Sequence, residues 1–137
     1  MYRELLKIKT GGRGFHELTD QAGDIAARSG IRDGLCHAFI RHTSASLVIT
    51  ENADPDVLRD LETVLAGLAP DGDPRYVHTA EGPDDMSAHV RSVLTQTGIA
   101  IPVADGELML GAWQGLFLWE HRTRGHSRQV VVSVFAG

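Results

Sequence analysis

The sequence predicts a single α+β domain in which two to three helices accompany a mixed, largely antiparallel sheet. The chain has 137 residues, the size of one domain, so we expect one domain over residues 1–137. Two segments, beginning at Asp54 and Asp84, each combine residues that favour a helix start with apolar residues that recur at helical spacing on one face. Much of the remaining chain predicts about six to eight short strands between turns, and this mixture favours the α+β class.

The N-terminal half contains one short helix and four strand-like segments. The helix is expected over Asp20–Ser29, because Gly30 follows as a stop residue. The strand-like segments are apolar, β-branched or weakly alternating. They are Leu5–Thr10, Phe15–Thr19, Leu35–Arg41 and Leu47–Thr50.

The second helix has the clearest boundaries. Asp54 is a favoured N-cap residue and Pro55 suits the first turn, while Gly67 and Pro70 end the helix. Apolar residues recur on one of its faces. They are Val57, Leu58, Leu61, Val64, Leu65 and Leu68.

The third helix is expected to be capped by Asp84 and Asp85 and to end before Gly98. Its inward face should carry side chains at helical spacing, with one histidine among them. These residues are Met86, His89, Val90, Val93, Leu94 and Thr97.

The C-terminal part is expected to form two hairpins. The first joins Ile99–Val103 to Glu107–Leu110 through Ala104-Asp105-Gly106, a typical hairpin turn. The second joins Leu116–His121 to Gln129–Phe135. The last strand carries apolar residues on both of its faces, which predicts that both faces are covered.

Composition excludes several classes of protein. The net charge of −5 argues against nucleic acid as a partner, because such binding requires many cations. No apolar run approaches the roughly 18 residues of a membrane span, and the N-terminus lacks a signal peptide's apolar region. Cys36 is the single cysteine, so neither a disulfide nor a cysteine-based zinc module is expected. A cytoplasmic protein that binds no membrane follows.

Seven histidines are the unusual feature of the composition, and His42 opens the first cluster of polar residues. Thr43 and Ser44 follow it, and Asn52 and Asp54 lead into the second helix. A helix N-terminus has free N–H groups that can hold an anion. An ordinary Ser/Thr turn followed by an N-cap explains the same residues.

The second cluster extends from His78 to His89, with three carboxylates in the intervening loop. Histidines from a loop and from an adjoining helix can converge on zinc or a related metal. The alternative is a hydrogen-bonded core histidine beside a solvated acidic loop.

The third cluster contains Trp113, Gln114 and Glu120. A carboxylate that ends an apolar strand is expected to be partly desolvated, which raises its pKa. Arg128 could pair with Glu120 or bind a phosphate. The neighbouring His121 is expected at a strand end that reaches solvent. The remaining histidines and Cys36 are expected in the scaffold, the surface or the core: His16, His37, His126 and Cys36.

Taken together, these clusters resemble the YjbQ family of secondary thiamine-phosphate synthase-like proteins. The matching stretches occur in order over nearly the whole chain, from about Leu5 to Phe135. They are His42-Thr43-Ser44-Ala45-Ser46-Leu47, Glu51-Asn52-Ala53-Asp54-Pro55, His78-Thr79, Glu81-Gly82, Asp84-Asp85-Met86, Ala88-His89, Leu110-Gly111, Trp113-Gln114-Gly115 and Glu120-His121-Arg122.

The resemblance implies a homotrimer with a site near the subunit boundaries and a weak thiamine-phosphate synthase activity. In that reaction a hydroxymethylpyrimidine diphosphate loses pyrophosphate and joins a thiazole phosphate. The resemblance also implies a divalent metal, zinc or magnesium, on His42, His78 and His89. The implied polar surround consists of Asn52, Asp54, Gln114, Glu120 and Arg128.

Individual roles can be assigned within that implied site. Glu120, Gln114 and Asn52 are the catalytic candidates, with Glu120 exchanging a proton and Gln114 pairing with a pyrimidine stacked on Trp113. The substrate-binding candidates are Thr43, Ser44, Asp54, Trp113 and Arg128.

Two other functions remain open. The same residues would suit a metal-dependent phosphohydrolase, or a trimeric protein that binds a small anion or metal without turnover. The chain has few lysines and arginines for tight diphosphate binding, which favours a secondary rather than a principal synthase activity.

Overall fold

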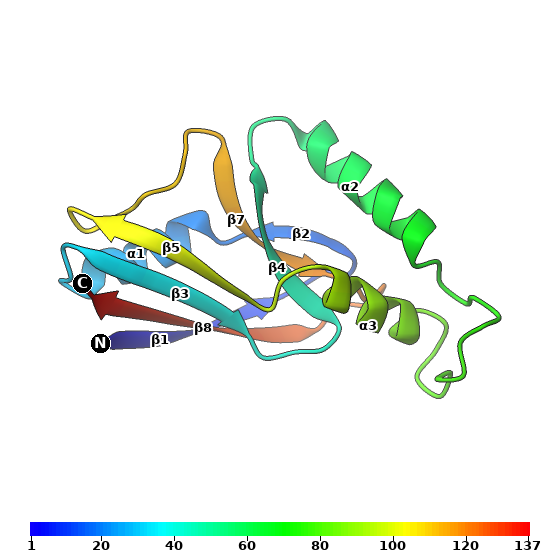
Figure 1. Ribbon diagram of the computed structural model, residues 1–137. Coiled ribbons are helices and arrows are strands. Elements are labelled where there is room, and N and C mark those ends of the chain that lie inside the picture. Colours follow the sequence, from blue (N-terminus) through cyan, green and yellow to red (C-terminus); the bar gives the residue numbers. More distant parts are fainter.

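Eight strands in the computed structural model, which describes residues 1–137, form two antiparallel sheets (Figure 1). The larger sheet has five strands in the order β1-β8-β3-β5-β6. Their bounds are β1 Tyr2–Lys9, β8 Ser127–Ala136, β3 Gly34–Ile40, β5 Gly98–Ala104 and β6 Glu107–Leu108. The smaller sheet has the order β2-β7-β4. Its strands are β2 Gly14–Glu17, β7 Gln114–Glu120 and β4 Ala45–Glu51. The α+β class is confirmed, and every pairing is antiparallel rather than mixed.

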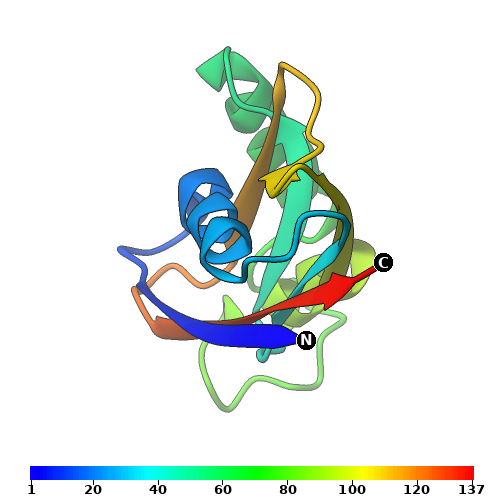
Figure 2. The ribbon, with the colours of Figure 1, turned by 90° about the vertical axis from the view of Figure 1, so that its left-hand side faces the viewer.

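The hydrophobic core lies between the inner faces of the two sheets. Alternation along β8 places Val130, Val132 and Val134 fully inside it, opposite Leu118 of β7. Helix α1 (Thr19–Arg28) closes one side of this core with Ile25 (Figure 2). Cys36 is also a buried core residue, as expected.

The two remaining helices, α2 (Pro55–Leu68) and α3 (Asp85–Leu94), lie at one end of the molecule (Figure 1). The start of α2 is confirmed, because an Asp54 side-chain oxygen accepts a hydrogen bond of 2.9 Å from the backbone N–H of Asp56. The predicted apolar face of α2 is largely uncovered in the single chain. Only Leu65 is buried, whereas Leu68 is 64% exposed.

The predicted inward face of α3 is wrong. Val93 is 84% exposed, whereas Ser87 and Arg91 are buried. The buried arginine has an acidic partner, since Arg91 Nη1 donates to Glu62 Oε2 at 2.9 Å. Asp84 does not cap α3 through its side chain, because its carboxylate binds elsewhere.

One of the two expected hairpins is confirmed. Asp105 and Gly106, both at positive φ, form the two-residue turn between β5 and β6. The expected hairpin between β7 and β8 is wrong, because these strands belong to different sheets. The segment between them crosses from one sheet to the other and passes α3, where Thr123 donates its backbone N–H to Asp84.

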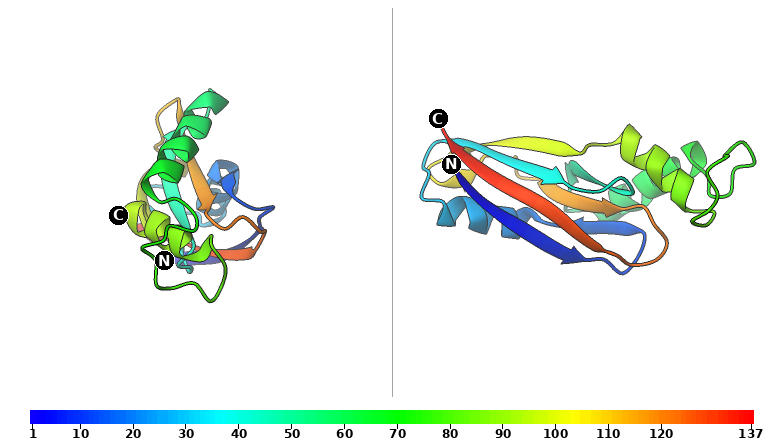
Figure 3. Two further views of the ribbon diagram at one scale, coloured as in Figure 1. Left: turned by 90° about the vertical axis from the view of Figure 1, so that its right-hand side faces the viewer. Right: turned by 90° about the horizontal axis from the view of Figure 1, so that it is seen from below.

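The outer face of the larger sheet carries no helix (Figure 3). Along the outer face of β8, Ser133 is buried and Val131 is half-buried, whereas Phe135 is 41% exposed, so the expected covering of both faces holds only in part for the single chain. No helix in the chain is both long and apolar enough to span a lipid bilayer.

Candidate metal centre

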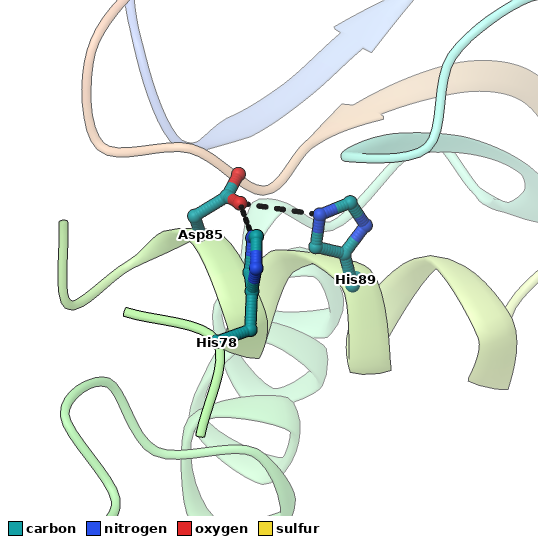
Figure 4. Close-up of side chains that lie close together, drawn as sticks. All are labelled: His78, Asp85 and His89. Carbon is teal, nitrogen blue, oxygen red and sulfur yellow. Dashed lines mark hydrogen bonds and ion pairs between the residues drawn. The ribbon is translucent and has the colours of Figure 1, made fainter. Parts of the chain in front are cut away.

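Three side chains of the second sequence cluster converge at the start of α3 (Figure 4). Asp85 is the first residue of α3 and His89 follows one turn later, so both project from the same helix face. His78 approaches from the preceding loop. Asp85 Oδ2 lies 2.7 Å from His78 Nε2 and 3.2 Å from His89 Nε2.

Arg122, which follows β7, binds the Asp85 oxygen that does not contact the two histidines. Arg122 Nη1 donates to Asp85 Oδ1 at 2.9 Å, and its Nε donates to Asp84 Oδ2 at 3.0 Å. Burial raises the pKa of Asp85, but the hydrogen bond from His78 and the charges of His89 and Arg122 outweigh it, so the pKa lies below its ordinary value. Asp85 is therefore a buried, oriented and ionised carboxylate.

The chemistry of this group fits a divalent metal ion. His78, Asp85 and His89 each offer one ligand atom, and these atoms all lie within 4.8 Å of one another. Two imidazole nitrogens and one carboxylate oxygen form a common ligand set for zinc and other first-row metals. The His78 and His89 side chains are 44% and 32% exposed, so the group is reached from solvent.

His42 is not part of this group. Its Nε2 accepts a 2.8 Å hydrogen bond from the backbone N–H of Gln129, and burial together with the charge of Arg128 lowers the pKa of His42. His42 and Thr43 instead line a pocket of about 520 Å³ that His89 also borders. This volume lies within the usual range for small-molecule sites.

Glu120 and Arg128 form a buried ion pair next to His42. Arg128 Nε donates to Glu120 Oε1 at 2.8 Å, a second contact joins Arg128 Nη2 to Glu120 Oε2, and Ser44 Oγ accepts from the same Nη2 at 3.0 Å. Thr10 Oγ1 also donates to Glu120 Oε1, at 2.6 Å.

The expected upward shift of the Glu120 pKa is wrong. Burial raises the pKa of Glu120, but hydrogen bonds from Arg128, from Thr10 and from the Arg122 backbone together lower it by more, so the net shift is downward. Glu120 is fully buried and held ionised. The ionised carboxylate holds the Arg128 guanidinium in place through two contacts.

Asn52, Trp113 and Gln114 lie at the opposite end of the smaller sheet. Gln114 begins β7 and Glu120 ends it, which separates them by roughly 20 Å of extended chain. Asn52 and Gln114 border one pocket of about 440 Å³, and Trp113 is 66% exposed nearby. The three catalytic candidates are thus not brought together within one chain.

The other sequence candidates have structural partners. Asp54 acts as the N-cap of α2. His121 is fully buried, not exposed at a strand end as expected, and its Nε2 lies 2.8 Å from Ser46 Oγ. Burial and then the charge of Arg91 lower the pKa of His121 to about 3, so this imidazole is neutral.

Sequence reasoning missed two residues at the candidate metal centre, Asp85 and its partner Arg122. Asp85 was assigned to a cap, although its spacing of four from His89 places both on one helix face. Arg122 had no comparable indication, because it reaches Asp85 only through the tertiary fold.

Comparisons with known proteins agree over nearly the whole chain. The family model described as UPF0047 protein YjbQ-like matches residues 4–137. A UPF0047 protein of Synechocystis is 52% identical over 133 residues, covering 97% of this chain and 90% of the relative. UPF0047 protein YjbQ of Escherichia coli O157:H7 is 38% identical over 134 residues, covering 97% and 96%.

A solved structure is also similar. A protein of the YjbQ/UPF0047 family from Clostridium acetobutylicum superposes with a TM-score of 0.89 at 32% identity, covering 96% of this chain and 99% of that one. The sequence motifs, the fold and the relatives all point the same way, and the chain belongs to the UPF0047/YjbQ family.

Proposed function

We propose that this protein is a cytoplasmic, zinc-dependent enzyme that forms thiamine phosphate at a low rate from a hydroxymethylpyrimidine diphosphate and a thiazole phosphate. The supporting observation is the convergence of His78, Asp85 and His89, with Asp85 oriented by Arg122. Ligands with a supporting partner of this kind are typical of working metal centres.

The ligand types favour zinc over magnesium. Imidazole nitrogen suits zinc, whereas magnesium prefers oxygen ligands and keeps several waters. Two of the three donors here are imidazoles. When bound, zinc would supply Lewis-acid stabilisation to the oxygens of the departing pyrophosphate.

The residues around the metal centre can bind and orient the substrate. Phe39 and Val93 give the pocket beside His89 an apolar surface, while His42 and Thr43 give it polar groups. A pyrimidine ring fits such a mixed surface. Arg122 holds the Asp85 carboxylate in place, so the two imidazoles keep a fixed partner.

We also propose a homotrimer. Four large apolar residues of the uncovered sheet face are each 40–44% exposed: Leu5, Leu35, Phe39 and Phe135. An apolar face of this kind commonly marks a subunit interface. A second copy could also bring the distant Gln114 and Trp113 end close to the metal centre, which a single chain does not do.

Light scattering should therefore give a mass of about 45 kDa, three times the chain mass of 14.9 kDa. Phe39→Lys places a charge within the apolar face and should shift the mass toward that of one chain. The control is Glu107→Lys, at an exposed position outside this set of apolar residues, which should leave the mass unchanged. A wild-type mass near 15 kDa would contradict the trimer.

The enzymatic proposal is tested by incubating the protein with the two phosphorylated precursors and zinc. Thiamine phosphate, measured by chromatography, should form above a control without protein, and chelation or His78→Ala should reduce it to that control. His16→Ala removes a histidine outside the metal centre and should keep the activity.

Other outcomes identify the competing functions. Release of inorganic phosphate from either precursor without coupling indicates a phosphohydrolase. Saturable binding with no product in calorimetry indicates a protein that binds without turnover. Either result would replace the synthase proposal.

A further inference from the structure

The loop between α2 and α3 projects from one end of the molecule, and its base is fixed (Figure 1). Near the start of the loop, Asp71 accepts two hydrogen bonds from Arg13, at 2.8 and 3.0 Å. Just beyond its end, Asp84 is bound by two residues that follow β7. The backbone N–H of Gly72 donates to the carbonyl oxygen of Pro83 at 2.9 Å and joins the two ends. Loops closed in this way are Ω-loops, which are frequently functional.

A glycine lies at each end of residues 73–81, which we call the flap. Gly72 has a φ of 65° and Gly82 a φ of 101°. Glycine adopts this region without the steric cost that a side chain imposes, and its backbone rotates more freely than that of other residues. The flap itself contains no strand or helix. Two glycines at a fixed base therefore give the flap a hinge at each end.

Beyond its glycine ends, the flap is joined to the rest of the chain by two hydrogen bonds. His78 Nε2 contacts Asp85 Oδ2 at 2.7 Å (Figure 4), and Arg122 Nη2 donates to the Glu81 carbonyl oxygen at 3.0 Å. Both bonds lead to the candidate metal centre, because Arg122 also binds Asp85. The position of the flap therefore depends on this centre.

The flap has no apolar core of its own. Val77 is 97% exposed, and Tyr76, His78 and Pro83 border a pocket of about 370 Å³ within the loop. The ion pair of the flap, between Arg75 and Asp73, is internal and does not reach the body of the protein. A segment with so few buried apolar contacts opens at a low cost in free energy.

We propose that the flap is a lid that zinc holds closed by joining His78 to Asp85 and His89. This inference rests on the zinc centre of the proposed function and adds a moving part to it. Without the metal, single hydrogen bonds at His78 and Glu81 hold the flap, and it opens about its two glycines. His78 then moves away with the flap, while Asp85 and His89 remain on α3. Opening admits substrate to the centre, and closure excludes water from it.

A different explanation is a rigid loop that presents His78 in a fixed position. Pro74 and Pro83 restrict the backbone, and the ion pair of Asp73 with Arg75 ties two flap residues together. A rigid loop would keep His78 beside Asp85 whether or not a metal is bound. The two explanations therefore differ in how much zinc protects the flap from a protease.

Limited digestion with trypsin tests the proposal without any catalytic turnover. Trypsin should cut after Arg75, whose side chain is 83% exposed, and the rate should follow the population of the open flap. Saturating zinc should slow this cut by about tenfold or more relative to protein in a chelator. Mass spectrometry measures the rate through the fragments 1–75 and 76–137.

Two variants that each lose one imidazole separate closure of the flap from metal binding. His78→Ala removes the flap's ligand, so it should be cut at the metal-free rate even when zinc saturates the remaining ligands. His89→Ala is the matched control. It keeps His78 and Asp85 as ligands, so saturating zinc should still slow the cut.

The outcomes distinguish the flap from the rest of the proposed function. Equal cleavage with and without zinc, while a competing chelator shows that zinc is bound, would overturn the flap and leave the metal centre. Zinc protection of His78→Ala equal to that of wild type would also overturn it. No zinc binding by wild type would overturn both. A protein that makes no thiamine phosphate but shows the expected protection would support the flap and remove the synthase.

Discussion

Removal of either imidazole from the group of His78, Asp85 and His89 should lower the affinity for Zn²⁺ by at least about 100-fold. Loss of a residue that only supports a ligand costs 10–100-fold in typical metal sites, and loss of a ligand costs more. His78→Ala and His89→Ala each leave one imidazole and Asp85. Competition against a chromophoric chelator at pH 7 measures the change.

Two further variants separate the loss of a metal ligand from general damage to the fold. His16→Ala should keep wild-type affinity, because His16 lies on β2 outside the metal centre. His89→Cys should recover part of the affinity, since a thiolate is also a zinc ligand. Wild-type zinc affinity in both alanine variants would show that these histidines only hydrogen-bond to Asp85.

A variant of Arg122 tests whether this residue orients Asp85 in the same candidate centre. Arg122→Gln removes the charged contact to Asp85 Oδ1 while the three metal-binding groups remain. We expect zinc affinity to fall by about 10–100-fold, less than in the alanine variants. An unchanged affinity would show that Asp85 needs no orientation from Arg122.

Local chemistry explains which parts of the fold could be predicted. Asp54 and Pro55 define the start of α2 without help from the rest of the chain, and Asp105-Gly106 defines a hairpin turn by itself. The partner of β7 could not be predicted locally. The segment after β7 carries turn residues like a hairpin, but its contact with Asp84 leads it past α3 to the other sheet.

Helical periodicity failed for α3 because the core there is polar. Ser87 and Arg91 face inward, with Arg91 matched to Glu62, while Val93 faces outward. A pattern based on apolar side chains selects the opposite face. Burial of a charge with a partner depends on two distant elements and leaves no periodic trace in the sequence.

The candidate site was predicted in its residue types more than in its arrangement. His78 and His89 were paired by their shared acidic loop, and the structure places them on one carboxylate. His42 was added by resemblance, yet its Nε2 is occupied by Gln129. Gln114 and Glu120 are close in sequence, but an extended strand separates their side chains, which only a strand assignment with exact ends would reveal.

Replacement of Arg128 by methionine should destabilise the fold by about 3–5 kcal/mol at pH 7, because it leaves the Glu120 charge buried without its partner. Glu120 is fully buried and Arg128 supplies two of its contacts. Urea unfolding measures the loss. Arg32→Met is the control, since its pair with Asp105 is 71% and 88% exposed and contributes less than about 1 kcal/mol.

The pH dependence of this loss has a defined sign. The pKa of Glu120 is lowered in the folded protein. Its ion pair therefore stabilises the fold at pH values above the ordinary pKa of 4.5, and this contribution is lost as the pH falls through the lowered pKa. In Arg128→Met the carboxyl can be buried protonated. The stability difference between wild type and variant should therefore narrow as the pH falls toward 4.

A double variant distinguishes loss of a partner from loss of packing. Arg128→Met/Glu120→Leu removes both charges, and replacement of a buried ion pair by apolar groups is often neutral. It should recover most of the stability that Arg128→Met loses. If the double variant is as unstable as the single one, the cost comes from the packing and hydrogen bonds around Thr10 and Ser44, and the unpaired carboxylate is not its cause.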